Sequence, residues 1–284
     1  MTFRRAEEVV KDNEKGASEL LEDVVISIQQ IDEDKIENYL ETLVKNRYSM
    51  TPLLNLANKV FLSLERGKEI DSIIENLEED FLSRKAKAVT NMKRFLKKKN
   101  YTNILTHSYS STVLESISSV NKVKVLESRP KKEGRITARK LSKKGIEVEY
   151  WIDAAMYKAL KNVDCAIVGA DTISKEGFFN KIGTTPLALI SDSLDLSLYV
   201  VADTSKVLSS KIPAPKGESH PPEEVWDDGH DIIVKNDYFE LTQLKKAEFM
   251  TEDSLIKDEK IKKIAERKSV AEKLLKIHPL IRER

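Results

Sequence analysis

The second part of this 284-residue chain alternates short apolar runs with helical stretches, and this alternation constrains the fold most. Runs of four to six residues have the length of buried strands. The expected strands are Asn103–Thr106, Lys122–Leu126, Glu147–Ile152, Cys165–Ala170, Leu198–Ala202 and Asp231–Val234. The expected helices between them are Ser110–Ser119, Ile136–Lys144, Ala154–Lys161 and Thr184–Ser193. This spacing predicts an α/β fold with a parallel, doubly wound sheet and helices on both faces.

The first hundred residues show helical periodicity and no convincing strand pattern. The expected helices are Ser18–Ile31, Asp34–Lys45, a helix from Thr51 to Gly67, and one long helix over Glu69–Lys98. We therefore predict an N-terminal all-helical domain over residues 1–100 and an α/β domain over residues 101–284. The basic run Lys97–Asn100 marks the boundary. It is either a patch for phosphate or nucleic acid or, more commonly for such a run, a solvated helix end.

Composition narrows the class of protein. Lys+Arg 48 against Asp+Glu 47 gives a net charge of +1, so no direct contact with nucleic acid is expected. The single cysteine, Cys165, excludes an internal disulfide framework and suits a core position in a reducing compartment. No apolar run approaches the length of a membrane span, and the first residues lack the core of a signal peptide. We expect a cytoplasmic protein without a membrane partner.

Polar side chains follow five of the expected strands where each strand ends. They are His107, Ser108, Ser110, Ser111 and Thr112 after the first strand, Glu127, Ser128 and Arg129 after the second, Asp153 after the third, Asp171 after the fourth, and Asp203 and Lys206 after the fifth. The carboxyl ends of parallel strands share one edge of a sheet, so these side chains should converge there in a ligand site. Asp153 and Asp203 also suit helix N-caps.

The stretch Asp164–Ala188 concentrates this chemistry. Asp171 ends a buried strand, and partial desolvation there would raise its pKa and suit it to acid–base work. Asn180 and Lys181 precede an expected helix start. The cations suited to phosphate are Lys181, Lys206, Arg47 and Arg129. The alternative interpretation is a strand, a surface loop and a capped helix with no ligand.

Motifs for other chemistries are missing from the sequence. It has no histidine, cysteine and acid cluster at metal-ligand spacing, no Gly-x-Ser-x-Gly elbow and no P-loop. It also has no Gly-x-Gly-x-x-Gly after a strand, so nucleotide-dependent redox chemistry is not supported. We predict neither a metal nor a cofactor.

Several segments together resemble one protein family. They are THSYSSTV at Thr106–Val113, ESRPKKEGRITARKL at Glu127–Leu141, IDAAM at Ile152–Met156, VGADTI at Val168–Ile173 and NKIGT at Asn180–Thr184. These segments are similar to those of the family of translation initiation factor 2B alpha, beta and delta subunits. That family includes ribose-1,5-bisphosphate isomerase and methylthioribose-1-phosphate isomerase. The resemblance covers almost the whole chain and is specific for the family, but not for the member.

The resemblance implies a Rossmann-like α/β domain behind an N-terminal helical domain, assembled as a homodimer or larger homo-oligomer. The family's isomerases use a cysteine and an aspartate to convert a sugar phosphate from aldose to ketose, and the corresponding residues here are Ser108 and Asp171. The positions that the resemblance assigns to phosphate and sugar binding are Lys15, Gly16, Ala17, Arg47, Ser110, Ser111, Thr112, Asn180, Lys181 and Lys206.

Ser108 is the departure that decides the function. A thiol reaches its thiolate near neutral pH, whereas an unassisted serine hydroxyl does not ionise, and only His107 lies close enough in sequence to assist. The first hypothesis is therefore an archaeal-type homologue of the regulatory subunits that binds a phosphorylated sugar or nucleotide and contacts initiation factor 2. The second is a ribose-1,5-bisphosphate isomerase that tolerates Ser108 and uses Asp171 as acid and base. Isomerisation of methylthioribose 1-phosphate is less favoured, because the loop after Ser108 lacks a glycine-rich run.

Overall fold

A mostly parallel sheet of seven strands forms the centre of the protein, in a computed structural model that describes residues 4–12, 15–215, 217, 219–227 and 231–282. The strands are β1 Asn103–Thr106, β2 Lys122–Leu126, β3 Glu147–Trp151, β4 Cys165–Val168, β7 Leu198–Val201, β9 Glu248–Met250 and β10 Leu255–Ile256. Their order is β10-β9-β7-β4-β1-β2-β3, and only the pair of β9 and β10 is antiparallel. The winding direction reverses between β1 and β4, which places a topological switch point at their carboxyl ends.

Helices cover both faces of this sheet, as the strand–helix alternation predicts. One face carries α6 Ser83–Lys99, α7 Ser111–Ser116 and α8 Gly134–Ser142; the other carries α9 Met156–Leu160, α10 Thr184–Ser193 and α11 Asp258–Arg267. Successive strand residues point to opposite faces. Thus Ile167 packs in one apolar cluster and Val168 in the other. Cys165 is a buried core residue of the α6 side, as expected.

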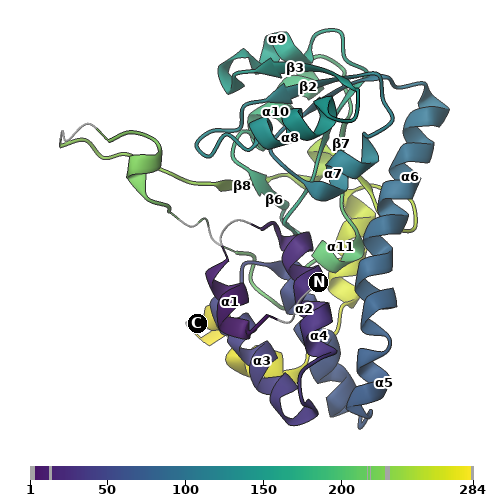
Figure 1. Ribbon diagram of the computed structural model, residues 1–284, viewed down its shortest axis with the longest axis vertical. Helices are drawn as coiled ribbons and strands as arrows, with labels where there is room; N and C mark the ends of the chain where they lie inside the picture. The colour runs from purple at the N-terminus through teal and green to yellow at the C-terminus, as the bar shows by residue number, and fades with distance from the viewer. Residues whose placement is uncertain (1–3, 13–14, 216, 218, 228–230, 283–284) are drawn as a thin grey trace.

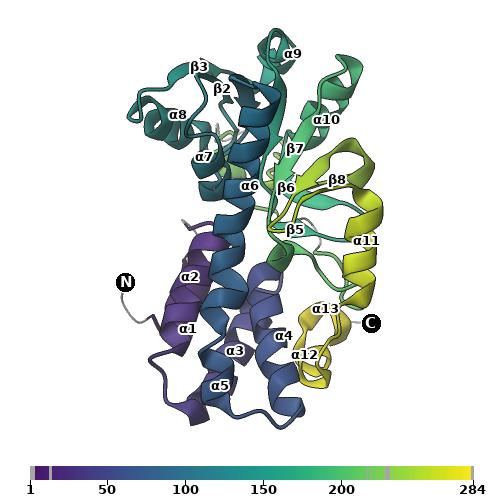
Figure 2. The same cartoon turned by 90° about the vertical axis from the view of Figure 1, so that its right-hand side faces the viewer.

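The N-terminal region is a layer of helices with its own apolar cluster, below the sheet in Figure 1. Its helices are α1 Ala6–Lys11, α2 Ala17–Ile28, α3 Glu33–Asn46, α4 Thr51–Glu65 and α5 Ile70–Ile74, followed by a π-helical turn, Glu78–Leu82. The chain end returns to this layer, because Ala271 and Leu274 belong to its cluster. Ala271 immediately precedes α12 Glu272–Ile277, and Leu274 lies on it. The last helix is α13 Pro279–Arg282 (Figure 2). The domain boundary at residue 100 stays a prediction.

Two expected elements are wrong. The single helix over Glu69–Lys98 is divided, because α5 ends at Ile74 and regular α-helix resumes only with α6. The expected strand Asp231–Val234 is not paired in either sheet, and Ile233 there is 83% exposed. The position beside β7 belongs to β9, a strand of three residues.

A second, antiparallel sheet stands at the carboxyl edge of the first. It consists of β5 Thr172–Ile173, β6 Phe178–Lys181 and β8 Phe239–Thr242, in the order β5-β6-β8. An arm runs from residue 219 to 238, less its undescribed residues, and projects away from the body before β8 (Figure 1). This sheet carries Asn180 and Lys181, which places both beside the end of β4.

Candidate functional site

His107 ties together three loops at the carboxyl edge of the sheet. Its side chain is buried, with Nε2 2.8 Å from the carbonyl oxygen of Ile182 and Nδ1 3.1 Å from the hydroxyl of Ser128. Burial lowers the pKa of this imidazole, so it is neutral at pH 7. Gly183, at φ 101°, lets the β6–α10 turn approach the ring, because a Cβ there would lie 3.0 Å from Nε2.

Ser108 is held through its backbone. Its N–H donates to the hydroxyl oxygen of Ser128 at 2.7 Å, its carbonyl oxygen accepts from Thr137 at 2.8 Å, and its φ of 69° is left-handed. Both ring nitrogens of His107 are engaged elsewhere. No described residue places a base within hydrogen-bonding distance of the Ser108 hydroxyl. The hydroxyl therefore lacks a group that would take its proton.

Asp171 lies within the electrostatic influence of two buried cations, Lys206 and Lys181. It follows β4, and its backbone N–H donates to the carbonyl oxygen of Phe179 at 2.9 Å. Burial raises the pKa of its carboxyl group, and the charges of Lys206 and Lys181 oppose that rise. The ammonium of Lys206 donates to the carbonyl oxygen of Ala170 at 2.7 Å. The structure thus brings one acid and two cations from three segments to the end of β4.

Lys181 already has partners within the protein. Its ammonium is paired with Glu133 at 2.7 Å and lies 4.7 Å from the ring centre of Tyr238. The second carboxylate oxygen of Glu133 is buried without a hydrogen-bond partner among the described residues. Asn180 is also buried, and its amide donates to the hydroxyl of Thr184 at 2.9 Å. The amide of Asn180 therefore holds the turn before α10.

Glu133 and Tyr238 are site residues that the sequence interpretation missed. Glu133 immediately precedes α8, in the loop after β2, so its place at a strand's carboxyl end was a usable signal. Tyr238 immediately precedes β8, and no sequence signal connects it to Lys181.

The start of α7 faces Gly169, the residue after β4. Ser110 caps this helix by accepting from the backbone N–H of Val113 at 3.3 Å. A Cβ on Gly169 would come within 2.8 Å of the Ser110 hydroxyl, so a larger residue here would have to displace this helix-capping side chain. Ser111 is partly exposed, whereas the hydroxyl of Thr112 is buried without a hydrogen-bond partner among the described residues. These residues border the switch point from the β1 side.

Asp153 organises the loop after β2 and does not cap a helix through its side chain. Its carboxylate accepts the backbone N–H groups of Ser128 and Arg129, each at 2.8 Å. The side chain of Arg129 is exposed and donates to the carbonyl oxygen of Val225 on the arm at 3.1 Å. Arg129 is therefore not gathered with the two buried lysines.

The segment 15–17 lies beside the loop after β1, because the hydroxyl of Tyr109 donates to Glu19 on α2 at 3.2 Å. Lys15 is exposed and its ammonium pairs with Asp23 at 2.6 Å. The residues at the start of α2 are Gly16, its N-cap, and Ala17, which is buried.

Arg47 precedes α4, whose first turn contacts the site's loops. The hydroxyl of Thr51 lies 2.7 Å from that of Thr172, the residue after Asp171. The guanidinium of Arg47 donates to the carbonyl oxygen of Asp12 at 2.5 Å. The helical layer thus closes one side of the site. Arg47 contacts Asp12, the residue that ends α1 within that layer.

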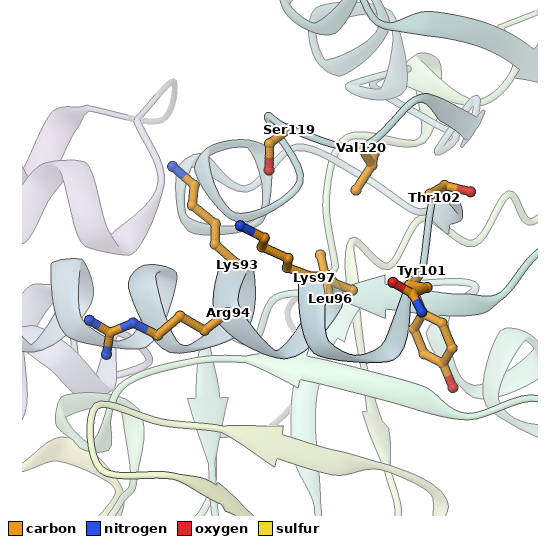
Figure 3. A pocket seen from close by; sticks show the side chains of 9 residues that line it. Lys93, Arg94, Leu96, Lys97, Tyr101, Thr102, Ser119 and Val120 are labelled. Carbon is orange, nitrogen blue, oxygen red and sulfur yellow. The ribbon is translucent and has the colours of Figure 1, made fainter.

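A cavity of about 430 Å³ lies away from these residues (Figure 3). Its walls come from α6 and from the segments that lead into β1 and β2, at the amino ends of those strands. The residues around it are Lys93, Arg94, Leu96, Lys97, Asn100, Tyr101, Thr102, Ser119 and Val120. It is at the opposite edge of the sheet from Asp171 and does not belong to the candidate site.

The arrangement suits proton transfer beside an anionic ligand. A carboxyl group whose pKa is raised keeps its proton to higher pH, which suits it to acid–base work, and two buried ammonium groups attract negative charge. Within the described part of the chain, no three histidine, cysteine or acidic side chains form a group suited to a metal ion. Likewise, no described helix is long and apolar enough to cross a membrane.

The fold and these residues define a Rossmann-like α/β protein with a polar candidate site at its topological switch point. The chain belongs to the Initiation factor 2 subunit family, whose model matches residues 6–247. It is 28% identical over 249 residues to ribose 1,5-bisphosphate isomerase of Methanocaldococcus jannaschii, covering 81% of this chain and 80% of the relative.

Other relatives carry a different name. The chain is 34% identical over 216 residues to a putative translation initiation factor eIF-2B subunit 2-like protein of Pyrococcus horikoshii, covering 70% of this chain and 76% of the relative. The crystal structure of the Pyrococcus horikoshii OT3 translation initiation factor eIF-2B matches with a TM-score of 0.70 and 28% identity, over 88% of this chain and 94% of that one. The resemblance to this family is therefore confirmed, and both kinds of member are among the relatives.

Proposed function

We propose that this protein is a regulatory-subunit-like member of the family that binds a phosphorylated sugar or nucleotide at the carboxyl edge of its sheet. The observation that carries the proposal is that two buried cations, Lys181 and Lys206, act electrostatically on Asp171 at the edge of the sheet where Ser108 lies without a base. The cations favour a phosphate. The unassisted hydroxyl disfavours the chemistry that a cysteine would perform there.

Glu133 favours a ligand with hydroxyl groups over a bare phosphate. Its unpartnered carboxylate oxygen is an acceptor beside Lys181, and a buried acceptor gains most from a donor. A sugar hydroxyl supplies such a donor, whereas a phosphate oxygen would be repelled. In this arrangement Lys181 attracts the phosphate and Glu133 orients the sugar.

The second candidate is a ribose 1,5-bisphosphate isomerase, which the likeness to the Methanocaldococcus jannaschii enzyme over most of both chains favours. Aldose–ketose isomerisation moves a proton between neighbouring carbons and their oxygens, so it needs an acid–base group. Asp171, with its raised pKa, would shuttle that proton, and Lys206 would stabilise the charge that develops on oxygen.

Binding and turnover measured on the same protein separate the two candidates. Isothermal titration with ribose 1,5-bisphosphate and with adenosine monophosphate tests binding, and formation of ribulose 1,5-bisphosphate tests catalysis. The binding proposal expects an affinity that Lys181→Ala weakens by about tenfold, with no turnover. The control is Lys175→Ala, an exposed lysine in the β5–β6 turn. Turnover that disappears in Asp171→Asn establishes the isomerase instead.

Self-association is the second part of the proposal. Exposed apolar side chains gather on β8 and the neighbouring α10, where Leu189 is 51% exposed and Phe239 and Leu241 are each 42% exposed. Large apolar side chains exposed on neighbouring elements commonly mark a contact between proteins. We propose that these side chains join two copies of the chain. Light scattering after Leu241→Asp should show a smaller species than the wild type, while Ile136→Asp, at an exposed position on α8, should leave the mass unchanged. A contact with initiation factor 2 also remains a proposal.

A further inference from the structure

The turn that carries Lys206, residues 204–208, is fastened to the helical layer by Asn55. Asn55 lies on α4 and is 9% exposed. Its amide nitrogen donates to the carbonyl oxygens of Ser205 at 2.5 Å and Val207 at 2.9 Å. These two carbonyls flank Lys206, so one side chain from the helical layer fixes both ends of the peptide segment that bears this cation.

Lys268 fastens the same turn from the other end of the chain. Its ammonium donates to the carbonyl oxygens of Thr204 at 2.8 Å and Val207 at 2.7 Å. No carboxylate lies within ion-pair distance of this ammonium among the described residues, so its close partners are these backbone oxygens. Burial lowers the pKa of Lys268 to about 7, and while this side chain carries its proton its bonds to the two carbonyl oxygens are charge-assisted, which is the stronger kind. Lys268 thus holds the turn through two of its backbone carbonyl oxygens.

Further hydrogen bonds hold the turn. Asp203 caps it by accepting the backbone N–H of Ser205 at 2.9 Å, which confirms the expected cap. Glu252, after β9, accepts the backbone N–H of Thr204 at 2.9 Å. The backbone N–H of Leu208 donates to the carbonyl oxygen of Ile173 on β5 at 2.8 Å.

The contacts that Asn55 and Lys268 make with this turn affect the site through Lys206. The ammonium of Lys206 reaches the carbonyl oxygen of Ala170, next to Asp171, only while the turn keeps its place. Charges interact strongly in a buried site because water screens them little, so a displacement of this ammonium changes both the attraction for a phosphate and the acidity of Asp171.

We propose that Asn55 and Lys268 are positioning residues for Lys206: they contact no ligand, and they set ligand affinity by holding the turn that presents its ammonium. This inference rests on the proposed binding function. It assigns a role in the site to the helical layer and to the chain's C-terminal segment, neither of which supplies this cation.

A double-mutant cycle tests the inference. Affinity for ribose 1,5-bisphosphate is measured by isothermal titration for the wild type, Lys206→Met, Lys268→Met and the double variant, with thermal melting as a check of folding. We expect each single change to weaken binding by about tenfold, and the double variant to bind no more weakly than Lys206→Met. Lys268→Arg, which keeps a cationic donor, should restore part of the affinity. Lys262→Met, on α11 away from the turn, should bind like the wild type.

The outcomes separate this inference from the proposed function. If the wild type binds neither ribose 1,5-bisphosphate nor adenosine monophosphate, or Lys206→Met binds equally well, the proposed function fails. If Lys206→Met weakens binding and Lys268→Met does not, or the two losses simply add, only the positioning role fails. Asn55→Leu repeats the test if Lys268→Met does not fold.

A measurement on the unaltered protein completes the test. Amide hydrogen exchange in residues 204–208 should slow when ribose 1,5-bisphosphate saturates the protein, because the ligand then adds a further restraint to Lys206. Exchange that stays unchanged at saturation contradicts the role of this turn.

Discussion

The Nδ1 atom of His107 lies 3.1 Å from the hydroxyl oxygen of Ser128, so the ring that could have served Ser108 is bonded to a different serine. The same Ser128 oxygen accepts the backbone N–H of Ser108 at 2.7 Å and lies 3.1 Å from the carbonyl oxygen of Leu126. Ser128 is therefore the centre of the loop contacts at the ends of β1 and β2. Because Ser128 holds the backbone of Ser108 and is bonded to the ring of His107, the Ser108 hydroxyl has no base to take its proton.

Replacing Ser128 by alanine should destabilise the protein by about 1–3 kcal/mol. The change leaves a buried backbone N–H and a buried imidazole nitrogen without their partner, and unsatisfied buried groups cost this much. Urea unfolding at pH 7 measures the free energy of unfolding. Ser142→Ala, at the exposed end of α8, is the matched control and should shift it by less than about 0.5 kcal/mol. Equal effects of the two changes would contradict the central place of Ser128.

Replacing Ser108 by cysteine should increase the formation of ribulose 1,5-bisphosphate at least about tenfold, because a thiolate forms far more readily than an alkoxide near neutral pH. The charge of Lys181, which acts on the neighbouring His107, favours an anion in this region. The measurement is product formation from ribose 1,5-bisphosphate at pH 8. Ser111→Cys, a thiol three residues further on, should give no increase. If Ser108→Cys binds the substrate and remains inactive, Ser108 is not what limits catalysis.

Replacing Asp171 by asparagine should stabilise the unliganded protein at pH 7. A carboxyl group whose folded pKa is raised above its unfolded value favours the protonated form in the fold. Its contribution to stability is therefore present at low pH and is lost as the pH rises through the folded pKa. Asparagine resembles the protonated acid at every pH, so its advantage should be larger at pH 7 than at pH 4. A destabilised variant at pH 7 would show that the two lysines outweigh the burial of the carboxylate.

The sequence predicts the parts of this protein that depend on local pattern. The strands β4 and β7 are recognisable because each is a bounded apolar run, as a strand buried on both faces requires. The edge strand β3 is instead recognisable by the alternation of apolar and charged residues at its start. The strand β9 escapes the same test, because it has only three residues and begins with Glu248. The break between α5 and α6 was not predictable, because it does not disturb the helical spacing of the apolar residues in the sequence.

The candidate site was predictable in its acids and cations but not in their pairings. Polar residues at strand ends converge by topology alone, which is why Asp171, Lys181 and Lys206 could be named together. The ion pair of Lys181 with Glu133 joins residues 48 apart in the chain, and only the folded structure brings them together. The direction of the His107 ring is likewise a tertiary property, and it decides whether Ser108 has a base.

The protein should lose stability in mild acid because of His278. This side chain is fully buried beside the ring of Tyr48, and neither of its ring nitrogens has a hydrogen-bond partner among the described residues. Burial lowers its pKa to about 4.

The folded protein therefore keeps His278 neutral while the unfolded chain binds a proton below about pH 6.5, so the stability it confers is lost progressively between pH 6.5 and pH 4. The loss from this group is at most about 3 kcal/mol. Urea unfolding of the wild type and of His278→Leu at pH 7 and pH 4.5 measures it. Carboxyl groups titrate in both proteins, so the relevant quantity is the difference between their two pH dependences. A smaller decrease in His278→Leu is the expected result, whereas parallel curves would mean that His278 is protonated within the fold or reached by water.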